Sequence, residues 1–412
     1  MLHVVMNGQV IGDLGGLGRR LRLRYSPEAE LEPAFVPLSV NMPATQPRWR
    51  GQRLDAWLAG LLPDRDQVLQ HWRTQFGIQS LEVIDLLAHL GEDLAGAAQF
   101  VRDDRLETVL SRAGTVVPLN DDAVADLARA ARRDTLPYDG DAQVGYFSLA
   151  GAQAKFALQK TPAGWALPSG AQPSTHIFKP AIPGLENQDV VEVVTMRLAS
   201  ELGLPTAHSQ LVTIGGERLI EIERYDRFDV DGQWQRVHQE DLCQALGIHP
   251  LNKYEAQGGP GVAACAEVIR RTCGDQDVLT FARSVMFNYA VRGSDAHARN
   301  YSLLLTPGDV RLAPLYDLNS TLTFGDHWAN RLAMRIGGED RMDAIRWANW
   351  TQFAAEVGLD TQWVRDELIQ MIDAVPDGLS DICSSIDEVR PIRDTLTDRA
   401  ASWCKTVRQQ AL

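Results

Sequence analysis

The order of strand and helix patterns along the chain constrains its fold more than any other feature. Short apolar runs separated by turn residues recur before about residue 230, and the rest of the 412 residues is mostly helical in pattern. Strands gathered in one part of a chain and helices in another are typical of α+β proteins. We therefore expect an α+β fold, with a cleft where the strand-rich and helix-rich parts meet.

The first part of the chain, residues 1–138, is expected to form a small α/β domain. Residues 2–24 alternate apolar runs with Gly-rich turns, which predicts the start of a β-meander. Three segments with helical periodicity follow, and Pro63 breaks the first of them: residues 52–76, 80–100 and 119–133. The third helix is expected to be capped by aspartate, and the turn-rich stretch after it places the first domain boundary near residue 138.

The second part, residues 139–226, is predicted to be rich in strands, and the third part, residues 227–412, to be mostly helical. A clear helix over 189–204 has its apolar residues on one stripe and stops at Gly203 and Pro205. Strands are expected in four places: two joined by a small-residue turn over 144–160, one over 175–181, a hairpin around Gly215-Gly216 and a hairpin over 301–318.

Composition limits the partners and the compartment. The net charge of −14 makes a broad nucleic-acid surface unfavourable. It suits a basic protein partner, or a DNA complex in which another subunit supplies the cations. The five cysteines are scattered and show no CxxC pair, which favours reduced thiols in a cytosol over disulfides or a zinc site. No apolar window approaches about eighteen residues and the first residues lack a secretion signal, so we expect no membrane span.

A polar patch at 293–300, between a helix pattern and a strand pattern, has the residue types that phosphoryl transfer needs. Asp295 and Asn300 have the D-x-x-x-x-N spacing of the protein-kinase aspartate that orients the attacking hydroxyl and the asparagine that binds metal. Further on, Asp317 ends a strand, where a second magnesium-binding aspartate would lie. The same spacing is common in ordinary loops, Asp317 could cap a turn, and His297 could simply brace the backbone.

Features upstream of this patch stand in the order found in kinases. Lys179, one of only five lysines, lies on a short strand, as a phosphate-binding lysine would, and Glu192 follows at a helix start where it could pair with it. Residues 221–226 lead from strands to helices, where a kinase hinge would present backbone groups to adenine. Each feature also has a structural explanation. Lys179 could be an ordinary edge-strand lysine, and Glu192 could be a first-turn residue that the helix dipole favours.

The small residues around Gly151 would let the backbone approach a phosphate closely, as glycine-rich kinase loops do. Ala152 is one of them. The stretch has no G-x-G-x-x-G pattern, so a tight hairpin turn is the alternative interpretation.

Taken together, these motifs resemble the HipA-type serine/threonine kinase toxins of bacterial type II toxin–antitoxin modules. The resemblance covers nearly the whole chain. Its motifs are "MNGQVIGDL", "PLSVNMP", "LLPD" and "LGEDLAGAAQF" in the first domain, then "SLAGAQAK", "THIFKP", "ELGL", "ERYDR", "QEDLCQALG", "KYEAQGGPG", "GSDAHARN" and "LYDL". It implies a bilobal fold similar to those of protein kinases and phosphoinositide kinases, with ATP and Mg²⁺ as cofactors.

The resemblance also implies roles for the matching residues. Asp295 and Asn300 would be catalytic, with Asn300 and Asp317 as magnesium ligands, and Ser148 would be a regulatory autophosphorylation site whose phosphate silences the enzyme. Family members often have glutamate where this chain has Ala154. The residues expected to contact ATP are Lys179, Ala152, Gln153, Glu223, Tyr225, Asp226 (on the ribose) and His297.

The implied partners are a HipB-like DNA-binding antitoxin and a protein substrate, which in the family includes aminoacyl-tRNA synthetases. DNA would be reached only through the antitoxin, and the expected location is the bacterial cytoplasm. Two alternatives stay open: a small-molecule or lipid-headgroup kinase, against which the acidic charge argues at anionic membranes, and a catalytically idle co-repressor in an antitoxin–DNA complex.

Overall fold

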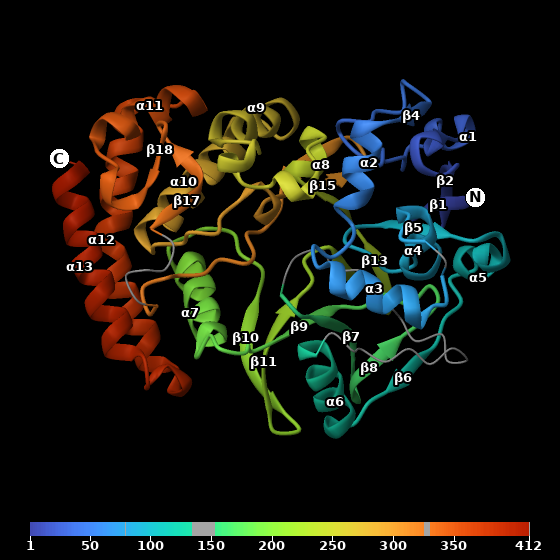
Figure 1. Ribbon diagram of the computed structural model, residues 1–412, viewed down its shortest axis with the longest axis horizontal. Helices are drawn as coiled ribbons and strands as arrows, with labels where there is room; N and C mark the ends of the chain where they lie inside the picture. The colour runs from blue at the N-terminus through green and yellow to red at the C-terminus, as the bar shows by residue number, and fades with distance from the viewer. Residues whose placement is uncertain (79, 134–152, 325–329, 412) are drawn as a thin grey trace. The chain divides into compact units, whose positions relative to one another are not determined.

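The computed structural model describes residues 1–78, 80–133, 153–324 and 330–411 (Figure 1). The chain divides into two compact units, which are described separately. The first contains residues 1–186, 210–251 and 303–310, and the second contains residues 187–209, 252–302 and 311–412. The predicted domain boundary near 138 falls outside the described residues.

The first unit begins with a five-stranded sheet of order β4-β3-β2-β1-β5. Antiparallel pairing of β1 with β2 and of β2 with β3 confirms the predicted meander. Buried aliphatic and aromatic side chains alternate with exposed arginines along β3, because successive side chains of a strand point to opposite faces. The strands are β1 (Leu2–Met6), β2 (Gln9–Gly15), β3 (Arg22–Tyr25), β4 (Arg48–Arg50) and β5 (Ala98–Val101).

The first unit also contains short helices. The predicted break at Pro63 is confirmed, since α2 ends at Ala59 and α3 starts at Asp66. The α6 helix is capped by the side chain of Asn120, which accepts from the amide of Ala123, so the predicted aspartate cap is wrong by residue type; the two residues cap equally well. The helices are α1 (Pro27–Glu30), α2 (Gln52–Ala59), α3 (Asp66–Gln75), α4 (Val83–Leu90), α5 (Leu106–Leu110), α6 (Asp121–Arg132) and α8 (Leu242–Leu246).

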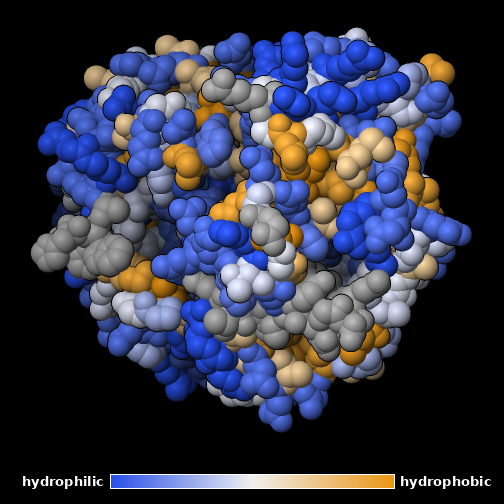
Figure 2. Space-filling model, turned by 45° about the vertical axis from the view of Figure 1, so that its right-hand side comes forward, coloured by the Kyte–Doolittle hydropathy of each residue, from blue (hydrophilic) through white to orange (hydrophobic). Residues whose placement is uncertain are grey.

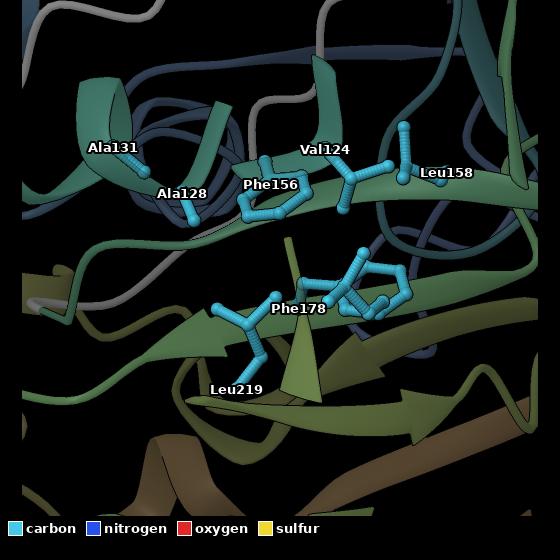
Figure 3. Close-up of a cluster of buried hydrophobic side chains, with 8 residues drawn as sticks. Val124, Ala128, Ala131, Phe156, Leu158, Phe178 and Leu219 are labelled. Carbon is cyan, nitrogen blue, oxygen red and sulfur yellow. The ribbon is translucent and has the colours of Figure 1, made fainter. Parts of the chain in front are cut away.

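The second sheet has six strands in the order β10-β11-β9-β7-β8-β6. Helix α6 packs on it, and Figure 3 shows Val124 and Ala128 of the helix facing Phe156, Phe178 and Leu219 of the strands. The Phe156 and Phe178 rings stack with their centroids 5.3 Å apart. The strands are β6 (Val116–Pro118), β7 (Phe156–Thr161), β8 (Gly164–Pro168), β9 (His176–Pro180), β10 (Ser209–Ile214) and β11 (Glu217–Glu223).

The expected hairpin around Gly215-Gly216 is confirmed by β10 and β11, and the expected strand over 175–181 by β9. Of the two strands expected over 144–160, β7 is present, and residues 144–152 lie outside the described part. After Glu223 the chain continues into strands rather than helices, so the expectation of a mostly helical stretch from 227 is wrong there. These strands are β12 (Arg227–Val230), β13 (Gln233–Arg236) and β14 (His238–Asp241), and β14 continues a sheet with the predicted hairpin of β15 (Ser302–Thr306) and β16 (Asp309–Leu312).

The second unit is mainly helical. Helices α12 and α13 run side by side (Figure 1), and Gly378 of α12 lets the Leu198 side chain of α7 approach closely. None of the helices in the described ranges is long and apolar enough to cross a membrane. The elements are α7 (Gln188–Glu201), α9 (Val262–Thr272), α10 (Asp275–Ala290), α11 (Trp347–Val357), α12 (Thr361–Ser385), α13 (Arg393–Ala411) and the hairpin of β17 (Arg331–Ile336) and β18 (Glu339–Arg341).

Candidate active site

The loop between α10 and β15 in the second unit holds Asp295 and Asn300. The backbone carbonyl of Asp295 accepts a hydrogen bond from the His297 amide at 2.8 Å and another from the Asn300 side-chain nitrogen, also at 2.8 Å. The Asn300 amide donates to the His297 carbonyl at 2.9 Å. Because the side-chain nitrogen of Asn300 is used within the loop, the side-chain oxygen Oδ1 is the atom that Asn300 presents to a ligand.

The hydroxyl of Tyr254 fixes the orientation of Asp295. It donates a hydrogen bond to Oδ1 of Asp295 at 2.7 Å, and its ring meets the His297 ring edge-on with centroids 5.2 Å apart. A carboxylate held by a donor on one oxygen keeps the other oxygen in a defined direction. Tyr254 therefore belongs to the site, although its position in the sequence, 41 residues before Asp295, does not indicate this.

The glycine-rich stretch 257–261 explains how Tyr254 is held. A side chain on Gly259 would lie 2.1 Å from the Asn252 carbonyl oxygen, and one on Gly261 would meet the Glu255 carboxylate. That carboxylate accepts the backbone amide of Arg335 at 2.6 Å, which ties the segment to β17. The glycines therefore permit a close turn that positions the tyrosine.

His297 is buried beside the two candidate acidic residues. Burial lowers the pKa of His297 to about 4, a shift that the nearby Asp295 carboxylate opposes and Lys253 reinforces, with smaller effects of Asp317 and Arg299. The imidazole is therefore neutral near pH 7. Its Nδ1 is a buried atom with no hydrogen-bond partner in the described part of the protein. The charges of both Asp295 and Asp317 act on this imidazole and favour its protonated form.

Asp317 has an unusual backbone conformation, with φ of 60°. Left-handed backbone at a residue other than glycine is uncommon, and it recurs at functional sites where the surroundings hold it. The two residues before Asp317 are held in place by hydrogen bonds. The Leu315 backbone pairs with Pro205 and Ala207. The Tyr316 hydroxyl donates to the Arg299 carbonyl at 2.7 Å. The residue before Asp317 is thus tied to the loop of Asp295 and Asn300 through the Arg299 carbonyl.

The residues of the second unit fit a magnesium ion bound together with phosphates. Mg²⁺ prefers oxygen ligands and is usually held by one or two carboxylates while phosphates and water complete the octahedron. The Asp317 carboxylate and the amide oxygen of Asn300 meet that need. The described ranges contain no cluster of three or more His, Cys, Asp or Glu side chains of the kind that holds a metal by itself.

The first unit carries the residues predicted to contact the rest of a nucleotide. Lys179 lies on the central strand β9, opposite Ile220 of β11, and is only 5% exposed. Gln153 has a buried side-chain nitrogen with no hydrogen-bond partner among the described residues, so it is a donor suited to an anion. Glu223 ends β11 and is exposed, while the Tyr225 hydroxyl donates to Gln239 at 2.5 Å.

Asp226 lies at the centre of a buried ion cluster. It is 2% exposed, and its carboxylate accepts from Arg224 at 2.8 and 3.0 Å, from the Gly96 amide at 2.7 Å and from Gln239 at 3.0 Å, with Arg227 also at 2.9 Å. Burial by itself raises the pKa of Asp226, but the Arg224 and Arg227 charges outweigh it and hold the pKa far below its usual range. This geometry favours a structural role, and ribose binding by Asp226 stays a prediction.

The remaining predicted residues are placed as follows. Glu192 lies one turn inside α7, in the second unit, buried and hydrogen-bonded to the side chain of Gln188 at 3.1 Å. Its pairing with Lys179 of the first unit stays a prediction. Ser148 and Ala152 lie outside the described residues.

Comparison with known proteins decides the family. The HipA-like C-terminal domain matches residues 147–379, and the HipA N-terminal domain matches residues 2–101. The chain belongs to the HipA kinase family.

Relatives support this assignment over almost the full length. Y4mE of Sinorhizobium fredii is 32% identical over 400 residues, which span 94% of this chain and 93% of the relative. The serine/threonine-protein kinase toxin HipA of Shewanella oneidensis is 28% identical over 369 residues, covering 84% and 81%. The solved complex of Shewanella oneidensis HipA, HipB and operator DNA matches with a TM-score of 0.84 at 24% identity, over 100% of this chain and 99% of that one. The predicted fold class, the mixed α+β fold of HipA, is thereby confirmed.

Two features of this HipA-family site were missed from the sequence alone. Tyr254 was part of the recognised "KYEAQGGPG" motif but had no assigned role, because its contact with Asp295 spans two separate loops. The buried arginines Arg224 and Arg227 had no predicted role, because their partner Asp93 is more than a hundred residues away in the chain.

Replacing Tyr254 with phenylalanine is expected to lower the turnover number of this HipA-family kinase about tenfold. Loss of a hydrogen bond to a charged group costs about 1.5 kcal/mol or more, and about 1.4 kcal/mol corresponds to a factor of ten in rate. The KM for ATP should stay the same, because the hydroxyl contacts Asp295. Steady-state kinetics with an unfolding curve as the folding control checks this. A normal turnover number with a raised KM for the phosphate acceptor would contradict the positioning role.

Proposed function

We propose that this chain is an ATP-dependent serine/threonine protein kinase. The observation that carries the proposal is the loop in which Asn300 and His297 close onto the backbone carbonyl of Asp295. The same loop accepts the Tyr316 hydroxyl at the Arg299 carbonyl, next to the left-handed backbone of Asp317. Phosphoryl transfer needs an oriented carboxylate, magnesium ligands and a phosphate-binding cation rather than elaborate covalent chemistry. Asp295, the Asn300–Asp317 pair and Lys179 supply these three kinds of group.

The residues would divide the work as follows. When bound, MgATP would supply the phosphoryl group, and its metal ion would neutralise negative charge on the phosphate oxygens. Asp295, oriented by Tyr254, would accept the hydrogen of the attacking hydroxyl through its second carboxylate oxygen. Asn300 and Asp317 would hold the metal through oxygen atoms. Lys179 and the amide nitrogen of Gln153, which has no hydrogen-bond partner among the described residues, would bind phosphate oxygens.

Several finer points belong to the same proposal. The Shewanella oneidensis complex contains HipB and operator DNA, and we infer that this chain is the toxin of a similar module with a HipB-like antitoxin in a bacterial cytoplasm. Its substrate would be a protein, with aminoacyl-tRNA synthetases as the first candidates. Autophosphorylation at Ser148 would add nearly two negative charges next to the ATP-binding stretch and switch the enzyme off.

The proposal is tested by incubating the purified protein with labelled ATP, magnesium and a bacterial lysate. Label should enter a protein band at serine or threonine, and the Asp295→Asn variant should give none. Label in lipid or in a small molecule would favour the alternative kinase class. Growth inhibition that survives Asp295→Asn would favour the idle co-repressor.

A further inference from the structure

An arginine-rich groove lies on the N-terminal sheet of the first unit, and none of its residues belongs to the candidate active site. Its volume is about 1190 Å³, larger than the pockets that enclose most small ligands. The walls come from β3, β4, the start of α2 and the turn after α8. Five arginines line it: Arg22, Arg24, Arg48, Arg50 and Arg53.

The register of β3 and β4 sets these arginines against one another. Arg22 is directly opposite Arg50, and Arg24 is directly opposite Arg48, while Leu23 and Trp49 between them turn to the buried face. Like charges that are directly opposite on an antiparallel pair destabilise the sheet. The strand pairing therefore places four exposed cations within one small area at a cost in stability.

Carboxylates neutralise this arginine groove only around Arg24. The pKa of the nearby Glu28 carboxyl is lowered by its hydrogen bond with Ser26 and, to a smaller extent, by the Arg24 charge. In the part of the chain that the structure describes, none of its five arginines forms an ion pair. Asp13 of β2 is paired directly with Arg24 of β3, but the Asp13 carboxylate is also hydrogen-bonded to the His3 ring at 2.9 Å. The Arg53 guanidinium lies 5.9 Å from the centroid of the Trp49 ring. In a chain with a net charge of −14, a cluster of five arginines that is only partly neutralised indicates an anionic ligand.

We propose that the arginine groove binds the phosphodiester backbone of a nucleic acid. The proposal rests on the proposed function, because the duplex DNA of a toxin–antitoxin complex is its first source. Guanidinium groups bind phosphate oxygens in pairs. Two neighbouring strands offer them at intervals of about 5 Å across and 7 Å along the sheet, a regular array that suits a uniform polyanion. Figure 2 shows strongly hydrophilic side chains along the upper edge of the face in view.

The acidic net charge of the whole chain does not prevent this contact. Charges farther away than about 8 Å are largely screened at physiological salt. The field that a phosphate meets in the groove therefore comes mainly from the five arginines, weakened at Arg24 by Asp13 and Glu28. A direct contact of this kind differs from our expectation that DNA is reached only through the antitoxin.

The test measures binding of the full-length protein, without antitoxin, to a fluorescent DNA duplex of about 20 base pairs over a series of salt concentrations. The Arg22→Gln/Arg50→Gln variant is expected to bind about tenfold more weakly at low salt. Its slope of log Kd against log salt should fall by about 1.8, since each phosphate contact contributes about 0.9. The control Arg271→Gln/Arg390→Gln makes the same charge change outside the groove and should keep the original slope. An RNA duplex of equal length distinguishes the source of the phosphates.

The outcomes separate this inference from the proposed kinase function. The Arg22/Arg50 variant should retain full phosphoryl transfer, and removal of the opposed charges should not lower its unfolding temperature. The inference is overturned if the two double variants bind both nucleic acids equally well, or if polyglutamate competes better than a duplex of equal charge, since that would assign the groove to an acidic polypeptide. A wild-type protein that binds duplex normally but transfers no phosphate would count against the kinase function alone.

Discussion

The Asp295→Asn variant is expected to transfer phosphate about a thousandfold more slowly than the wild type. A positioned general base contributes about a hundredfold to ten-thousandfold in rate, and the amide cannot take up the hydrogen of the attacking hydroxyl. Because asparagine has nearly the same shape, its side-chain oxygen still accepts the Tyr254 hydroxyl, and the closing hydrogen bonds of the loop go to the backbone carbonyl. Structure and ATP binding should therefore be preserved while turnover is lost.

Single-turnover kinetics with a saturating protein substrate is the appropriate measurement. Asp398→Asn serves as the control, because it makes the same chemical change at an exposed position on α13. It should leave the rate unaltered. An Asp295→Asn enzyme that retains more than a tenth of the wild-type rate would show that another group carries the reaction.

The Asp226→Asn variant is expected to lose about 3–5 kcal/mol of folding free energy. Arg224 and Arg227 are buried and depend on Asp226 and Asp93 for counter-charge. Removing one partner of a buried ion pair leaves an uncompensated charge in a medium that solvates it poorly. The low pKa of Asp226 means that its contribution is present above the normal aspartate pKa and is lost as the pH falls through the lowered value.

Urea unfolding followed by tryptophan fluorescence measures this loss. Asp126→Asn is the control: its ion pair with Arg129 is exposed, and such pairs contribute less than about 1 kcal/mol. An Asp226→Asn variant with the same urea midpoint as the wild type, but with weaker ATP binding, would contradict the structural role of Asp226. That result would instead support the predicted contact with ribose.

The sequence predicts the regular elements of this fold well, where periodicity and turn residues coincide. The meander of β1 to β3, helix α7 and the hairpin of β10 and β11 are all present where the pattern puts them. The hairpin of β12 and β13 was missed although its signal was present. Asp231-Gly232 forms its two-residue turn with positive φ at both positions, a strong hairpin signature.

The candidate site was predictable only as far as its motifs extend along the chain. Asp295 and Asn300 are five residues apart, so the sequence shows their spacing directly, and one hydrogen bond joins them. The Tyr254 contact, the strained Asp317 backbone and the cluster around Asp226 depend on residues brought together by tertiary folding. The pairing of Arg22 with Arg50 likewise follows from strand register, which separate strand predictions do not fix.

The central proposal is that Lys179 and Asp317 each take part in binding a magnesium nucleotide. It is tested most directly by calorimetric titration of a non-hydrolysable ATP analogue with magnesium into Lys179→Met, Asp317→Asn and the double variant. Asparagine tolerates the left-handed backbone of Asp317, and Lys160→Met, an exposed change on β7, is the control. We predict that each single variant binds at least about tenfold more weakly and that their effects are not additive, because the side chains share one ligand. Unchanged affinity in either single variant would contradict the claim.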